Sequence, residues 1–196
     1  MKELKTIDRK IILKNLGYEA ELIDKSFMDK IDTYEEELLT NIHPRYMCKC
    51  YDLAKEDDKV SLADCDLPLQ GPKIANELYY CKKAVLFCAT LSGDIDLLIG
   101  LANRDDIEKA VILDGIAAAA LEEYCDMVET DIADKFPDYQ ITFRFSPAYG
   151  DLPEGSERDF TAVLDSERRI GVSYSEIGSF TPRYSITAIL GLMEKK

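Results

Sequence analysis

One short apolar run constrains the fold of this chain more than any other feature. Residues 84–90 read AVLFCAT, and the run is bounded by Lys82-Lys83 on one side and by Ser92-Gly93 on the other. A continuous apolar run this short, with charge and a glycine at its ends, is typical of a strand that is buried on both faces. We therefore expect residues 84–90 to form the central strand of a sheet.

Two helices are expected ahead of this strand. The first covers residues 7–16, with Asp8 in position to cap its start. The second covers residues 24–42, where apolar side chains recur at helical intervals. It ends before Pro44, because the residue that precedes a proline disfavours the helical region. The glutamates at positions 35–37 are expected to form a solvated face of this helix.

The remainder of the chain mixes strands and helices without regular alternation. This order favours an α+β fold with a mixed or mainly antiparallel twisted sheet packed with helices. There is no internal repeat, linker or shift of composition, so we expect a single domain over residues 1–196, with residues 1–43 as a helical region and residues 44–196 as the α+β body. Further strands are expected around residues 46–53, 60–67, 140–146 and 184–191, and further helices from Pro72, from Asp94, over residues 105–135 and from Gly155.

The charge balance argues against two classes of partner. The formal net charge is −14, whereas binding to nucleic acid or to an anionic membrane surface depends on clustered cations. No apolar run reaches the length of a membrane span, and the start MKELKTIDRK lacks the apolar segment of a signal peptide. We expect a cytoplasmic protein with no nucleic-acid or membrane partner.

The cysteines raise the question of a metal site. Of the six, only Cys48 and Cys50 are close in sequence, and on a strand their side chains would share a face. Together with the sole histidine, His43, they could supply three ligands, but the second close pair that is typical of zinc sites is missing. In a cytoplasmic chain the default is reduced, mostly buried thiols. We therefore predict no metal.

Motifs for catalysis are missing. The single histidine precedes a proline, so a Ser-His-Asp triad would have no well-placed base. Residues 91–94, LSGD, contain one glycine and match neither dinucleotide nor P-loop spacing. With 38 acids, no carboxylate pair can be singled out. No catalytic residue is predicted, and whether the chain is an enzyme is left open.

Residues 140–153, QITFRFSPAYGDLP, carry the clearest signal for binding. An arginine that leads into a Pro/Gly turn places its five-donor fork beside exposed backbone groups, as in sites that grip a carboxylate or another planar polar ligand. The alternative is a surface hairpin on which Arg144 and Tyr149 are merely solvated. The first half alternates as a strand does, with one set of side chains on each face: Ile141, Phe143 and Phe145 against Thr142, Arg144 and Ser146.

The pattern R-x-x-P-x-Y-G, from Arg144 to Gly150, resembles the arginine-to-tyrosine motif of a known family. This family is the S-adenosylmethionine-binding activation domain of cobalamin-dependent methionine synthase. The resemblance implies that Arg144 holds the carboxylate of S-adenosylmethionine and that Ser146 and Tyr149 help to frame the ligand. Where the family's large enzymes commonly have glycine before the tyrosine, this chain has Ala148.

Two further segments resemble the same family. Its long helix carries a glutamate, in an alanine-rich setting, that contacts the ligand's amino group, and Ala120-Leu121-Glu122 matches that position best. Glu123 is the competing choice, and the alternative is that both glutamates face water. Residues 176–191, EIGSFTPRYSITAILG, resemble the family's Pro turn and closing strand. The resemblance thus implies an activation-domain fold, with Glu122 added to the ligand site.

The function that the resemblance implies is that of a standalone module. It would bind S-adenosylmethionine and support the reductive methylation, or reactivation, of a cobalamin-dependent methionine synthase that lacks its own activation domain. The cobalamin would be carried by that partner, and a flavodoxin-like protein would donate the electron. The alternatives are an interaction or scaffold protein that kept the fold and lost the ligand, and an unrelated small-molecule enzyme.

Overall fold

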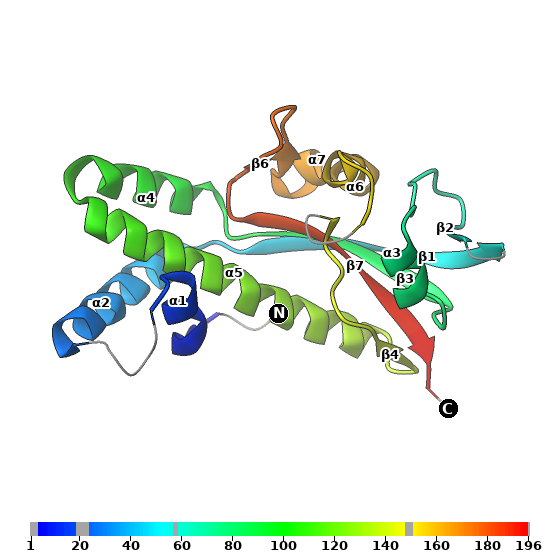
Figure 1. Cartoon of the computed structure of the whole chain (residues 1–196), viewed down its shortest axis with the longest axis horizontal. Helices are drawn as coiled ribbons and strands as arrows, with labels where there is room; N and C mark the ends of the chain where they lie inside the picture. Colours follow the sequence, from blue (N-terminus) through cyan, green and yellow to red (C-terminus); the bar gives the residue numbers. More distant parts are fainter. Residues whose placement is uncertain (1–3, 19–23, 57–58, 148–150, 196) are drawn as a thin grey trace. The chain divides into compact units, whose positions relative to one another are not determined.

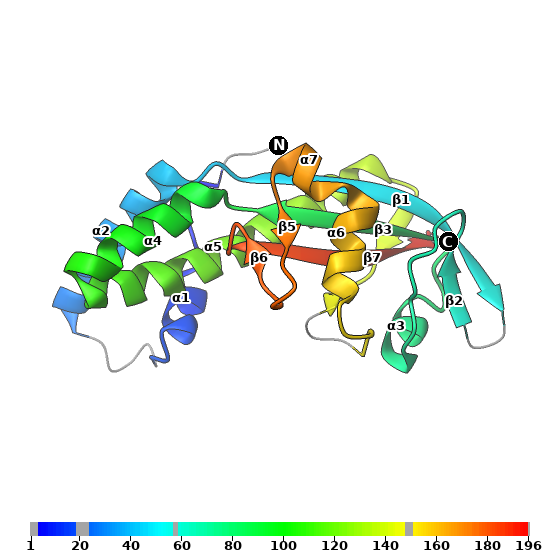
Figure 2. The ribbon, with the colours of Figure 1, turned by 90° about the horizontal axis from the view of Figure 1, so that it is seen from above.

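The computed structural model describes residues 4–18, 24–56, 59–147 and 151–195. Figure 1 labels the helices and strands, and Figure 2 shows them from above. The chain divides into two compact units: unit 1 is Met1–Arg45, Thr90–Met127 and Pro182–Tyr184, and unit 2 is Tyr46–Ala89, Val128–Thr181 and Ser185–Lys196. The expected division at residue 43 is not the one between the units, because unit 1 also takes in later segments. A single domain over residues 1–196 stays a prediction.

Unit 1 is built of helices. Asp8 and Asp24 cap the first two, because each carboxylate accepts a 2.8 Å bond from a backbone N–H in the first turn. The helix expected from Asp94 begins at Gly93, so Ser92 is its N-cap residue and Asp94 lies in its first turn. The helices are α1 (Arg9–Asn15), α2 (Lys25–Asn41), α4 (Gly93–Asp105) and the part of α5 (Ile107–Lys135) up to Met127.

The core of unit 1 draws apolar side chains from all four helices. The alanine-rich stretch of α5 lets the end of α1 approach closely: a Cβ at Gly115 would lie 2.6 Å from Leu16 Cδ2. Alanines Ala117, Ala119 and Ala120 are fully buried nearby in sequence. The largest buried aliphatic side chains of the unit include Ile12, Ile31, Leu38, Ile95, Ile112 and Ile116.

Unit 2 contains a five-stranded sheet with the order β2-β1-β3-β7-β4. The predicted central strand is β3, whose residues 84–90 are buried. The outer pairs are antiparallel by register. Bonds at the two ends of each inner pair run in opposite order along the chain, so these pairs are antiparallel too: Leu53 N to Lys82 O and His43 N to Leu91 O for β1 and β3, and Lys82 N to Leu192 O and Leu91 N to Tyr184 O for β3 and β7. The α+β class with an antiparallel sheet is thereby confirmed. The strands are β1 (Arg45–Glu56), β2 (Lys59–Leu62), β3 (Lys83–Thr90), β4 (Tyr139–Ile141) and β7 (Ser185–Glu194).

Helices cover both faces of this sheet in unit 2 (Figure 1). Tyr46 and Met47 are neighbours on β1 and point to opposite faces. Met47 packs against the main apolar cluster, while the Tyr46 hydroxyl donates to Asp131 in the C-terminal part of α5. The cluster joins Leu86 and Ile189 of the sheet to the elements on the face to which Met47 points. These are α3 (Pro72–Glu77), α6 (Ser156–Leu164), α7 (Ser166–Ile170) and β6 (Phe180–Thr181). Strand β5 (Ser173–Tyr174) pairs with β6.

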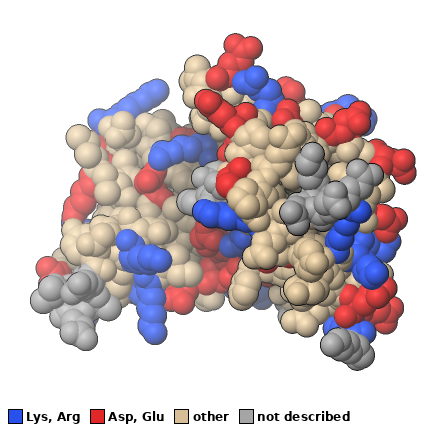
Figure 3. Space-filling view, turned by 45° about the vertical axis from the view of Figure 1, so that its right-hand side comes forward, with Lys and Arg blue, Asp and Glu red and all other residues tan. Residues whose placement is uncertain are grey.

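Acidic and basic side chains are interspersed over the face that Figure 3 draws. No helix in the described part of the chain is long and apolar enough to cross a bilayer.

Candidate functional site

The segment that carries Arg144 contains a β-bulge. Strand β4 ends at Ile141, which faces Leu192, and pairing resumes at Phe145, which faces Ile189. Three residues, 142–144, therefore stand opposite two on β7. The expected strict alternation over residues 140–146 is wrong at this point, because the extra residue breaks the period. The side chain of Phe143 is 88% exposed, whereas Phe145 packs against the core.

A glycine on β7 makes room for the bulge. Thr142 N donates to Gly191 O, and Gly191 N donates to Thr142 Oγ1, each over 2.9 Å. A Cβ at Gly191 would lie 2.9 Å from Thr142 Cγ2 and closer still to Cys81 Sγ. The absence of a side chain at Gly191 is thus what allows Thr142 to bond back to the neighbouring strand.

The bulge delivers Arg144 to a carboxylate on α5. Arg144 Nη1 donates to Glu129 Oε1 in an ion pair whose side chains are 16% and 20% exposed. A charge-assisted bond of this kind, largely shielded from water, is stronger than one between solvated ends. The sequence pattern does not single out Glu129. In the sequence, Glu129 is marked only by its position on α5, two helical turns after Glu122.

The described residues on either side of positions 148–150 are held within unit 2. Ser146 and Pro147 are buried, with Ser146 8% exposed. Asp151 Oδ2 accepts a 2.8 Å bond from Lys73 N at the start of α3. Gly71 makes this possible, since a Cβ there would lie 2.5 Å from Asp151 Oδ1. Tyr149, predicted to frame the ligand, lies outside the described residues.

The predicted site residues do not all belong to one unit. Arg144 and Ser146 are in unit 2, whereas Glu122 is a half-buried residue of α5 in unit 1. The rival choice, Glu123, accepts a 3.1 Å bond from Asp8 N at the start of α1. The grouping of Glu122 with Arg144 stays a prediction.

A second cluster of titratable groups lies where β1 meets α5 in unit 2. The bond from the Tyr46 hydroxyl, followed by that from Lys135, holds the pKa of the Asp131 carboxyl below its usual value. Burial is the main cause that raises the pKa of the Tyr46 hydroxyl. Lys135 Nζ also donates to Tyr46 over 2.6 Å. These groups bond to one another and fix α5 on the sheet.

Among the described residues, the cysteines and the histidine do not come together as a metal centre. All six cysteines lie among the described residues and none forms a disulfide, while burial raises the pKa of the Cys48 and Cys50 thiols. His43 Nδ1 lies 3.1 Å from Asp94 Oδ2 in unit 1. Over the residues that the structure describes, no three His, Cys, Asp or Glu side chains are grouped to hold a metal ion. The absence of a metal stays a prediction.

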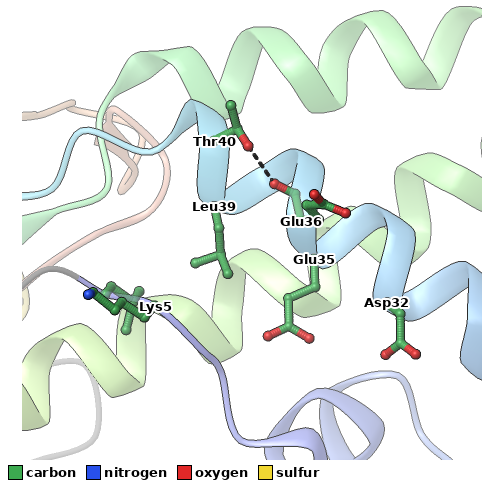
Figure 4. A pocket seen from close by; sticks show the side chains of 7 residues that line it. Lys5, Asp32, Glu35, Glu36, Leu39 and Thr40 are labelled. Carbon is green, nitrogen blue, oxygen red and sulfur yellow. Dashed lines mark hydrogen bonds between the residues drawn. The ribbon is translucent and has the colours of Figure 1, made fainter.

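Unit 1 contains an open cavity of about 550 Å³ (Figure 4). Its most buried acid, Glu35, accepts a 3.0 Å bond from Ile7 N and a bond from Arg9. Glu35 was expected on a solvated face, and this is wrong, because its carboxylate holds the chain ahead of α1. Both oxygens are used by the protein itself, so we interpret this cavity as structural. Its lining residues are Leu4, Lys5, Asp32, Glu35, Glu36, Leu39 and Thr40.

The chain is similar to a solved structure, the MetH reactivation domain bound to AdoHcy. The match covers 98% of this chain and 71% of that chain, with a TM-score of 0.66 and 13% sequence identity. No family model matches the chain, and no curated protein sequence matches it. At this identity the likeness establishes the fold, and it confirms an α+β fold of the reactivation-domain kind.

Proposed function

We propose that this chain binds S-adenosylmethionine and supports the reactivation of a cobalamin-dependent methionine synthase. The observation that carries the proposal is the Arg144 guanidinium, which is held on a bulge and already grips a carboxylate. The proposal is also supported by the fold, which matches that of a domain solved with AdoHcy bound. Fold alone does not imply function, so the binding of the ligand by Arg144 is the part to be tested.

The chemistry of the described residues fits the amino-acid end of the proposed ligand. That end carries a carboxylate, and a largely buried guanidinium is its best partner among protein side chains. Arg144 is 16% exposed and is oriented by its bond to Glu129, so its position is fixed before a ligand arrives. Such preorganisation lowers the entropy that binding must overcome.

When bound, S-adenosylmethionine would supply a methyl group to the reduced cobalamin of the partner synthase. The chain's own work is then to bind and orient, which needs no acid, base or nucleophile. Arg144 would hold the carboxylate, Ser146 and Tyr149 would frame the ligand, and an acid of α5, Glu122 by the family resemblance, would receive the ammonium. The partner would be a synthase without its own activation domain, with a flavodoxin-like protein as electron donor.

One observation favours a second candidate. Because Glu129 already neutralises Arg144, the chain could equally be an interaction or scaffold protein that kept the fold and lost the ligand. In that case the ion pair would be purely structural. The two candidates differ in whether S-adenosylmethionine binds at all.

Calorimetric titration with S-adenosylmethionine and with AdoHcy tests the proposal, together with melting curves. A ligand that binds only the native state at a hundred times its Kd stabilises it by about 2.7 kcal/mol, so the melting temperature should rise clearly. Absence of both heat and a melting shift at millimolar ligand contradicts the proposal and leaves the scaffold candidate. The role in reactivation is tested by adding the chain, ligand and reduced flavodoxin to an oxidised synthase that lacks its activation domain.

A further inference from the structure

We propose that this chain forms a two-fold symmetric dimer, in which β1 pairs antiparallel with β1 of a second copy and Cys48 lies at the symmetry axis. The surface concerned is residues 46–51 of β1 in unit 2, which we call the open edge. This inference goes beyond the proposed function and does not depend on a ligand.

Within the described part of the chain, no strand pairs with the outer side of the open edge. Strand β1 has β2 on one side and β3 on the other, and β2 pairs only with residues 53–56. One further bond, from Ala63 N to Asp52 O, extends that contact by a single residue. Figure 2 shows β1, β3 and β7 side by side, with β1 at the border. An unpaired edge of this kind is a template for another strand.

Three residues direct their backbone groups outward along the open edge. Tyr46 bonds to α5 on one face of the sheet, whereas the odd-numbered residues 47–53 contact the main apolar cluster or α6 on the other, so the alternation is unbroken. Leu53 N donates to the carbonyl just ahead of β3. Because N–H and C=O groups alternate between the two sides of a strand, those of Tyr46, Cys48 and Cys50 point away from β3.

The open edge lacks the protection that the other described borders of the sheet have. Strands β2 and β4 have only four and three residues, and β4 runs into the bulge. Short and bulged edges resist pairing. A lysine on an edge resists pairing too, but Lys49 Nζ donates to Val163 O over 2.6 Å and is thereby drawn onto one face of the sheet.

Charge and backbone chemistry select one register for two copies. With the axis at Cys48, Met47 lies opposite Lys49 of the copy, and no like charges meet. An axis at Lys49 would set two lysines opposite each other, which is unfavourable. An axis at Met47 would set Cys50 opposite Pro44, which has no N–H to donate. Axes farther along the strand would leave part of the open edge unpaired.

The two cysteines of the open edge report on this register. Cys48 would face Cys48 of the copy as a hydrogen-bonded pair, with the Cα atoms about 5.5 Å apart, which is within the range of a disulfide. Cys50 would lie four residues along the strands from Cys50 of the copy, about 14 Å away. Cys50 is the more exposed of the two, so random collisions between monomers would link Cys50 instead.

The first measurement is the mass in solution by light scattering. An interface one strand wide is small, so the dimer should dissociate at micromolar concentrations. The mass should rise from 22.2 kDa toward twice that value between about 1 and 100 µM. A salt concentration of about 0.15 M limits the repulsion between two copies of net charge −14. A mass that stays at 22.2 kDa throughout overturns the inference.

Oxidation with copper–phenanthroline tests the register. The oxidant takes up the two electrons that are released when two thiols become one disulfide. Covalent dimer should form in wild type and in Cys50→Ser, and should be lost in Cys48→Ser. Covalent dimer that persists in Cys48→Ser and is lost in Cys50→Ser contradicts the register.

Cys48→Pro and Cys48→Val test the pairing itself. The N–H of Cys48 points outward, so proline should leave the sheet of each copy intact while removing a bond at the centre of the dimer. Valine keeps that N–H and suits a strand. We expect at least a tenfold loss of association in Cys48→Pro and none in Cys48→Val. Equal association of the two variants overturns the inference. If melting curves show that Cys48→Pro does not fold, the cross-linking of Cys48→Ser and Cys50→Ser decides it.

Discussion

At the scale of single residues, the binding proposal depends most on Arg144. Arg144→Lys keeps the positive charge but replaces a planar fork with a single flexible ammonium. If the fork holds the ligand carboxylate, affinity for S-adenosylmethionine should fall by roughly ten- to a hundredfold, since a charge-assisted bond is worth about 1.5–3 kcal/mol. Calorimetric titration of the variant beside wild type measures the loss.

A matched substitution separates this effect from a general effect of losing an arginine. Arg168 is 76% exposed and pairs with Asp165 on the surface of unit 2, so Arg168→Lys should bind like wild type. Equal affinity of wild type and Arg144→Lys removes the basis for the site. A melting temperature that collapses in Arg144→Lys would instead assign a structural role to the Arg144–Glu129 pair.

The buried thiol of Cys88 predicts a dependence of stability on pH. Burial, partly offset by a bond from Ser166, raises its pKa to about 12, whereas a thiol in the unfolded chain ionises near 8.5. The raised value means that the stabilising contribution is complete below pH 8.5 and is lost as pH rises toward 12. Each pH unit in that window removes about 1.4 kcal/mol, hence about 2 kcal/mol between pH 8.5 and pH 10.

Cys88→Ala has no thiol to ionise, so it should lack this loss while sharing every other alkaline titration of the chain. Urea unfolding of both proteins at pH 7, 8.5 and 10 gives the comparison. The free-energy difference between wild type and variant should be constant up to pH 8.5 and shrink by about 2 kcal/mol at pH 10. A difference that stays constant to pH 10 would show that the thiol already ionises in the folded state.

Long-range partners explain which residues could not be placed from sequence. Glu35 to Glu37 look alike as a run of acids, yet Glu35 is buried because Ile7 N and Arg9 bond to it from the chain ahead of α1. Glu129 looks like any acid on a long helix, and only the bulge brings Arg144 to it. Arg144 could be proposed from sequence, because its neighbours along the chain carry the motif, and its role in binding a ligand stays a prediction.

At the scale of elements, the bulge opposite Gly191 makes a direct prediction. In Gly191→Ala the new methyl would meet Thr142 at 2.9 Å and Leu78 at 3.0 Å, with Cys81 closer still. Overpacking of this kind costs about 1–3 kcal/mol. Urea unfolding should therefore show a loss of this size, and Arg144 should bind its ligand less well because the bulge that carries it is displaced.

Gly100 is the control for this substitution. It is exposed on α4, and nothing lies within 4 Å of the position that a methyl group would take, so Gly100→Ala should leave stability unchanged or raise it by about 0.5–1 kcal/mol. A Gly191→Ala variant as stable as Gly100→Ala would mean that β4 and β7 accommodate the added methyl group without loss of stability. The bulge would then not be held by close packing.

Elements with local signals could be predicted, and those without could not. The caps Asp8 and Asp24 and the proline after α2 lie within a few residues of the ends they set, and β3 is marked by an unbroken apolar run. The bulge at residues 142–144 has no such signal. It depends on the register of β7, more than forty residues later in the chain, which a pattern over residues 140–146 does not contain.

At the scale of the whole molecule, the fold class could be predicted because strands and helices do not alternate along the chain. The two units could not, because each is gathered from segments that lie far apart in sequence. Unit 1 combines the two N-terminal helices with α4, much of α5 and Pro182–Tyr184. The amino-acid composition does not change at the points where the chain leaves one unit and enters the other.

That interleaving bears on how the chain unfolds. The chain passes between the units five times, after Arg45, Ala89, Met127, Thr181 and Tyr184. One passage lies inside α5, a continuous helix of 29 residues, whereas domains that unfold independently are normally joined by exposed linkers. Unfolding of one unit would remove the packing of the part of α5 that belongs to it, residues 107–127 in unit 1 or 128–135 in unit 2. A helix depends on packing for most of its stability.

We therefore expect one two-state transition, consistent with a single domain. Scanning calorimetry should give equal calorimetric and van't Hoff enthalpies, about 140 kcal/mol near 60 °C for a chain of this length. Two resolved transitions, or a van't Hoff enthalpy near half the calorimetric one, would mean that the units melt separately and that the chain holds two domains.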